Sequence, residues 1–248
     1  MRTLLKSIAV AALVLPMAAF AQTTIRNSRH DFSTSSTTTG PKTSATDQLC
    51  YFCHIPHNAL STLALWNHAA TATTNGWGAN NVTTAGTTLP TSISAASQRC
   101  MSCHDGTVSI GDTLNVDYVT GWTASGVAGS VSAGGLLQTN SLGYIRAANG
   151  TLDTNHPVSV PYGSSSTYNS IASRVTAADY TAAFFNSTCN GVSGCTTGSV
   201  NIKIYGTAAA NAGIECGSCH DPHQGIDTRK FVRVTTAGSA VCLACHVK

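Results

Sequence analysis

The feature that most constrains this chain is a pattern, Cys-x-x-Cys-His, that occurs four times. The copies begin at Cys50, Cys100, Cys216 and Cys242. Two thiols with this spacing lie about one helical turn apart and can add to the two vinyl groups on one edge of a porphyrin, and the following histidine can bind the iron. A zinc site would explain one Cys-x-x-Cys pair, but not a histidine after the second cysteine in all four. The pattern predicts four covalently bound haem c groups.

The motifs assign most of the cysteines and four of the histidines. The expected thioether residues are Cys50, Cys53, Cys100, Cys103, Cys216, Cys219, Cys242 and Cys245, and the expected proximal iron ligands are His54, His104, His220 and His246. Cys189 and Cys195 remain, in a turn-rich loop. In an oxidising compartment we expect them to form a small-loop disulfide.

The first residues predict export. Arg2 and Lys6 precede an apolar run over residues 8–20, and small residues lead to a cleavage site after Ala21. We therefore expect a signal peptide over residues 1–21 and one tetrahaem domain over residues 22–248. The run is too short for a membrane span, and no other run is long enough. The expected location is extracellular or at the cell surface, or alternatively periplasmic.

Composition predicts a fold with little regular structure. Only 9% of residues are charged, and Thr, Ser, Ala, Gly and Asn fill the spaces between motifs. Such a chain buries little apolar side-chain surface by itself. Large flat porphyrins can supply the core, and thioether bonds act as staples. We expect mostly coil, short helices at the haem motifs, a few short strands and a core formed by a stack of haems.

The charge balance excludes nucleic acid as a partner. Two of the 13 Lys and Arg residues lie in the leader, so 11 face 10 Asp and Glu, a net charge of +1. Each haem adds two propionates, which makes the loaded protein mildly acidic, about −3 when oxidised. Nucleic-acid binding requires the opposite sign.

Local patterns predict the few regular elements. We expect short helices over residues 47–54, 94–104 and 238–246, and another over residues 176–185. Asp47 is the expected N-cap of the first. Alternating Val200, Ile202 and Ile204 predict a strand, residues 230–235 predict a second, and the two are expected to pair.

The remaining histidines are enough to complete all four haems. Met1 and Met17 lie in the leader, and Met101 lies between Cys100 and Cys103, where it cannot easily reach over its own porphyrin. The expected distal ligands are His30, His57, His156 and His223, and His68 is expected to lie near a haem or at the surface. Four bis-histidine haems have low potentials and no open site for a substrate, so no enzyme activity is expected.

The spacing of His57 shows that it does not serve the nearest haem. It follows His54 by three residues, so both side chains leave nearly the same side of the backbone, with Cβ atoms roughly 5–6 Å apart in a helical turn. The two side chains cannot easily bind one iron from opposite faces of its haem. His57 is therefore expected to bind the iron of another haem.

The ordered set of motifs resembles a family of secreted tetrahaem cytochromes from metal-reducing and related bacteria. Besides the four haem motifs, the matching pieces are Arg29-His30-Asp31-Phe32-Ser33, Leu65-Trp66-Asn67 and Asn155-His156-Pro157-Val158-Ser159. Some members are similar to subunits of extracellular cytochrome nanowires, in which a histidine of one subunit binds a haem of the next. The resemblance implies a homopolymer in which His57 is the candidate crossing ligand, acting on the haem of Cys242 and Cys245.

Two other functions stay open. A monomeric periplasmic shuttle would have the same haems without a polymer. A multihaem reductase would need one open haem, which the number of histidines disfavours. Other extracytoplasmic cytochromes are the expected redox partners.

Overall fold

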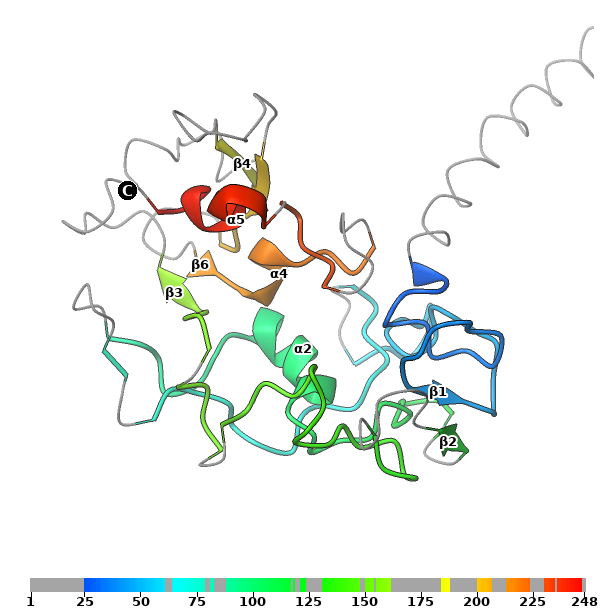
Figure 1. The fold of residues 1–248 in the computed structure, drawn as a ribbon. Helices are drawn as coiled ribbons and strands as arrows, with labels where there is room; N and C mark the ends of the chain where they lie inside the picture. Colours follow the sequence, from blue (N-terminus) through cyan, green and yellow to red (C-terminus); the bar gives the residue numbers. More distant parts are fainter. Residues whose placement is uncertain are drawn as a thin grey trace, which may run out of the picture.

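The structure, a computed structural model, describes residues 25–60, 64–78, 81–82, 88–116, 118, 121–123, 131–147, 150–153, 155–161, 184–187, 200–206, 213–223, 230–234 and 236–246. Most of this backbone is turn and coil, with a few short helices and strands (Figure 1). This confirms the low content of regular structure expected from the sequence. No helix in these ranges is long and apolar enough to cross a membrane.

Short helices carry three of the four Cys-x-x-Cys-His motifs. They are α2 (Ala95–His104), α4 (Cys216–Cys219) and α5 (Ala240–Leu243), the last preceded by the 3-10 turn η2 (Ala237–Ser239). The helix expected over residues 94–104 is confirmed: Ser94 is extended and precedes α2, and Gly106 leaves it with φ +70°. The helix expected over residues 238–246 is interrupted, because Gly238 and Ser239 are left-handed, with φ 59° and 61°.

The helix expected over residues 47–54 is wrong, because the chain makes only one turn there. The amides of Cys53 and His54 donate to Cys50 O at 3.2 and 2.8 Å. Asp47 does not cap this turn. Its carboxylate accepts from the backbone N–H of Ser35 at 3.1 Å and from the Ser35 hydroxyl. A carboxylate engaged by a distant segment cannot also bind the first amides of a helix.

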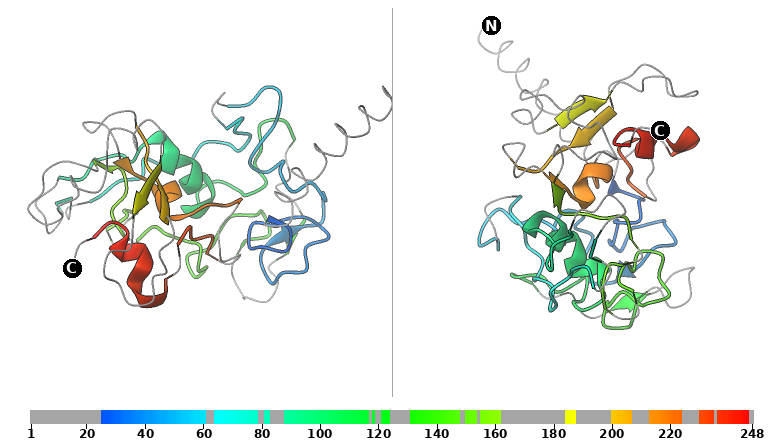
Figure 2. Two further views of the ribbon diagram at one scale, coloured as in Figure 1. Left: turned by 90° about the horizontal axis from the view of Figure 1, so that it is seen from above. Right: turned by 90° about the vertical axis from the view of Figure 1, so that its left-hand side faces the viewer.

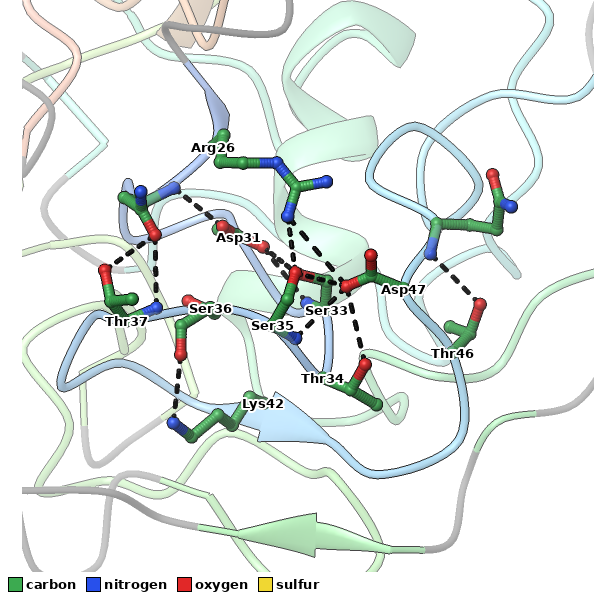
Figure 3. Close-up of polar contacts among 12 residues, drawn as sticks. Arg26, Asp31, Ser33, Thr34, Ser35, Ser36, Thr37, Lys42, Thr46 and Asp47 are labelled. Carbon is green, nitrogen blue, oxygen red and sulfur yellow. Dashed lines mark hydrogen bonds and ion pairs between the residues drawn. The ribbon is translucent and has the colours of Figure 1, made fainter.

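This polar network organises the N-terminal segment (Figure 3). Arg26 donates to Ser35 Oγ at 2.5 Å and lies 3.9 Å from Asp47, which ties the start of the segment to its end. Asp31 is fully buried and accepts from the amides of Asn27 and Ser33 and from the Ser33 hydroxyl. These bonds hold residues 26–47 as a compact loop that carries His30.

The strands form three small antiparallel pairs. They are β1 (Lys42–Thr43) with β2 (Trp122–Thr123), β3 (Val160–Pro161) with β6 (Gly213–Ile214), and β4 (Phe184–Ser187) with β5 (Val200–Lys203). In the longest pair, Phe184 lies opposite Lys203 and Ser187 opposite Val200. The pairs β1–β2 and β3–β6 join segments that are far apart in the sequence, whereas β4 and β5 are successive strands.

Strand predictions succeeded at β5 and failed elsewhere. The alternation in residues 200–204 is confirmed, since Ile202 and Ile204 are buried on one face. The strand expected over residues 230–235 is wrong: Val232 makes only an isolated bridge with His220, and β5 pairs with β4. The helix expected over residues 176–185 is wrong at Phe184 and Phe185, which belong to β4. Residues 176–183 lie outside the described residues.

Two apolar clusters fill the described part of the fold, and both include residues of the motifs themselves. The first consists of Phe32, Phe52, Ile110, Trp122, Val131 and Leu137. The second consists of Trp77, Leu89, Ile93, Met101 and Leu152. Phe52 and Met101, each one of the two variable residues inside a Cys-x-x-Cys pair, are 1% and 0% exposed. Packing these residues fixes the orientation of the turns that carry the cysteines.

Two motif helices lie side by side at the centre of the fold. Helix α4 contacts both α2 and strand β5. Figure 1 shows α4 directly above α2, and the two remain neighbours in the side view of Figure 2. The second and third haem motifs are therefore adjacent in space, although more than a hundred residues separate them in the sequence.

Candidate haem sites

Each motif presents its two cysteines and its histidine on one backbone turn. The His54 amide donates to Cys50 O at 2.8 Å, His220 to Cys216 O at 3.0 Å, and His246 to Cys242 O at 2.8 Å. The remaining motif lies in the last turns of α2. This repeated turn places the thiols and the imidazole on one side of the backbone, as attachment along one porphyrin edge requires.

Three of the four proximal histidines are oriented by a backbone carbonyl. His54 Nδ1 lies 2.5 Å from Ala64 O, His104 Nδ1 lies 2.6 Å from Gly143 O, and His220 Nδ1 lies 2.6 Å from Lys230 O. A carbonyl can only accept, so Nδ1 carries the proton in each ring. Nε2 then keeps its lone pair for a metal, and the hydrogen bond fixes the ring direction.

The first and third motifs share this surrounding loop as a structural repeat. The carbonyls that orient their histidines lie at the same offset, at residues 64 and 230. Cys53 O accepts from Asn67 N–H at 3.0 Å, and Cys219 O accepts from Arg233 N–H at 2.8 Å, again at equal offsets. Because both loops also contain a histidine three residues after the motif, His57 and His223 occupy equivalent positions.

Three pairs of histidine rings lie at the separation expected for two axial ligands of one iron. The ring centroids of His30 and His104 are 6.0 Å apart, those of His54 and His223 are 5.7 Å apart, and those of His156 and His246 are 6.0 Å apart. Metal–nitrogen distances of about 2.0–2.1 Å on each side, with each ring centre about 1.2 Å behind its nitrogen, give a separation of about 6.4 Å. The three pairs therefore fit bis-histidine haems.

The local environment keeps one of these pairs uncharged. Burial, together with repulsion from His104, His220 and His223, lowers the pKa of His30 to about 3. Burial also lowers the pKa of His104. His30 stacks on Phe231, with centroids 4.5 Å apart. Neutral imidazoles are the form that binds iron, so His30 and His104 are in the ligating form at neutral pH.

The other two histidines have opposite surroundings. His57 is exposed and makes no hydrogen bond or ring contact with the other described residues. His68 is 1% exposed, with Nδ1 2.8 Å from Ala69 O and Nε2 2.9 Å from Ser109 O. His68 Nε2 also lies 3.3 Å from the Cys103 thiol, so a neutral ring can donate from Nδ1 to Ala69 O and accept from this thiol, whereas His57 presents its imidazole at the surface.

The thiols bring neighbouring motifs together. A hydrogen bond with Cys216 is the main cause that raises the pKa of Cys100, and the same contact lowers the pKa of Cys216 to about 7. Burial raises the pKa of Cys53 and of Cys103 to about 12, and Cys103 adds to the shift at Cys53. The first and third motifs therefore both adjoin the second. Cys189 and Cys195 lie outside the described residues.

Sequence reasoning named the histidines but missed their pairing and the carbonyls that orient them. Backbone acceptors have no residue-type signature, so they left no signal. The loop repeat did leave a signal in the sequence, because a histidine follows the motif by three residues in both loops, at His57 and at His223. The structure also shows that the carboxylate of Glu215, next to Cys216, is buried. The sequence did not predict the surroundings of this carboxylate.

Comparison with known proteins agrees with this geometry. A family model described as a doubled CXXCH motif matches residues 208–248, which contain the third and fourth motifs. The match indicates a multihaem c-type cytochrome with covalently bound haem c. No curated protein gives a significant match.

Proposed function

We propose that this protein is a secreted electron-transfer cytochrome with four bis-histidine haem c groups, and that its subunits polymerise into an extracellular conductive filament. The observation that supports this best is the set of three histidine pairs at 5.7–6.0 Å. Haem c supplies an iron that exchanges one electron between its ferric and ferrous forms. The signal peptide predicted over residues 1–21 supports export.

The residues of the chain hold and tune these groups. The eight motif cysteines anchor the porphyrins, and histidine on both faces favours low potentials relative to a histidine–methionine pair. Hydrogen bonds from Nδ1 to carbonyls make the imidazoles stronger donors, which favours the ferric state further. Met101 does not compete as a ligand, because it is fully buried among apolar side chains.

The pairing changes which haem is proposed to bind His57. His156 lies beside His246, so the haem of Cys242 and Cys245, the target expected from the sequence, has a ligand from its own chain. His220 has no second histidine ring in contact among the described residues. His57 occupies the position in the first loop that His223 occupies in the third, and His223 serves the first haem. We assign His57 to the haem of His220 in the next subunit.

The surface around His57 supports a protein contact. Leu60, Leu65, Leu114 and Val116 are 53%, 43%, 40% and 44% exposed. They lie on two loops joined by hydrogen bonds from Leu114 N–H to Asn67 O at 2.8 Å and from Asn58 Nδ2 to Asn115 Oδ1 at 3.3 Å. Exposed apolar side chains that gather in one place mark interaction sites.

Electron microscopy of the secreted protein and spectroscopy of dissociated subunits test this function together. We expect filaments, four low-spin haems per subunit in the filament, and three in a dissociated monomer. His57→Ala should abolish filaments and leave one haem high-spin, whereas the control Val82→Ala, which shortens a side chain that is 57% exposed, should change neither. A proven monomer with four low-spin haems would favour a periplasmic shuttle instead. Perturbation of one haem by carbon monoxide in the intact assembly would favour the reductase.

A further inference from the structure

Glu215, the only glutamate in the chain, is a buried carboxylate next to a haem attachment site. It precedes Cys216 and is 4% exposed. Its Oε2 accepts from the hydroxyl of Ser97 at 2.5 Å and from that of Ser159 at 2.8 Å. Its side chain also accepts from the Ser218 amide in a capping box at the start of α4. Every partner is a neutral donor.

Among the described residues, no positively charged side chain forms an ion pair with this carboxylate. The ion pairs formed within the described ranges join Arg26 to Asp47 and Arg233 and His223 to Asp221, and none includes Glu215. Hydroxyl and amide donors stabilise a carboxylate but leave its net charge in place. A buried charge that is not paired acts at a lower effective dielectric constant than a surface charge, so its field reaches nearby groups more strongly.

The carboxylate lies between two haem attachment sites. Ser97, which donates to Glu215, belongs to α2, the helix that carries Cys100 and Cys103. The same Ser97 hydroxyl accepts from the Cys216 amide at 3.0 Å. The contact between the thiols of Cys100 and Cys216 completes the junction. The charge of Glu215 is therefore fixed where the second and third motifs meet.

We infer that Glu215 lowers the reduction potentials of the haems attached at Cys100/Cys103 and Cys216/Cys219. This inference rests on the proposed tetrahaem function. Reduction adds one negative charge, and a fixed anion at the α2–α4 junction opposes that change, so it favours the ferric state. Glu215 thereby shifts the reduction potentials of these two haems and not those of the other two.

Spectroelectrochemical titration of the holoprotein tests the inference. Glu215→Gln keeps the shape and one acceptor oxygen but removes the charge. We expect two of the four transitions to move upward, with at least a tenfold change in the ferric-to-ferrous ratio at a fixed potential, which is 59 mV for one electron. Glu215→Asp should leave them close to wild type.

A second variant keeps the inference testable if Glu215→Gln does not assemble. Ser97→Ala removes one donor and leaves the charge, so the same two transitions should move downward. Unchanged midpoints in either variant, or an equal shift of all four haems, would overturn the inference. Failure of the proposed function looks different: the wild-type protein itself would lack four haems or the low-spin bis-histidine spectrum.

Discussion

Replacement of Met101 separates a role in packing from a role in iron binding. Met101 is completely buried among Trp77, Leu89, Ile93 and Leu152. Met101→Ala removes most of this side chain, and substitutions of this kind cost about 2–5 kcal/mol. The site is fully enclosed, so we expect a loss near the middle of that range, about 3 kcal/mol. For a chain of this size the loss corresponds to a fall in Tm of about 6–12 °C.

The assay follows unfolding by circular dichroism and the haems by absorbance in the same sample. Met101→Ala should unfold at lower temperature with an unchanged low-spin spectrum. Met101→Leu, which conserves volume, should cost less than about 1.5 kcal/mol. The reasoning is refuted if Met101→Ala unfolds like the wild type. It is equally refuted if one haem becomes high-spin, because Met101 would then be an iron ligand.

Three further changes test individual contacts. Burial lowers the pKa of His68 from its ordinary value of 6.5. As the pH falls below 6.5, the unfolded chain therefore takes up this proton before the folded chain does, and stability falls. His68→Gln should make Tm less dependent on pH in this range. Burial raises the pKa of Tyr205 from 10.0 to about 12, so stability should fall as pH rises through this interval, and Tyr205→Phe should weaken that fall. Gly106 has φ +70°, and a Cβ there would lie 2.5 Å from Leu137 O; Gly106→Ala should lower the free energy of unfolding by more than about 1 kcal/mol, measured by urea titration.

The sequence was informative wherever a short-range pattern controls the structure. The helix over Ala95–His104 ends just before Gly106, whose positive φ is marked in the sequence by the residue type. The strand over Val200–Lys203 follows from alternating apolar residues whose buried face is visible in the sequence. Both depend on neighbours within about ten residues, which is the range over which propensity and periodicity act.

The structural features that the sequence did not predict depend on contacts between segments that are far apart in the chain. Asp47 has the side chain of an N-cap, but Ser35 competes for its carboxylate. Residues 230–234 have strand-like composition, yet they serve as the oriented partner of His220, because Lys230 O accepts from its Nδ1. In the same way, the choice of distal histidine for each proximal one depends on the packing of loops far apart in the sequence.

The histidine pairs also imply that the haems are completed in a different order from their synthesis. His30 can meet His104 after the first half of the chain has been synthesised, but His54 must wait for His223. The histidine pair at the first motif can therefore form only after the pair at the second motif, because its partner lies near the end of the sequence.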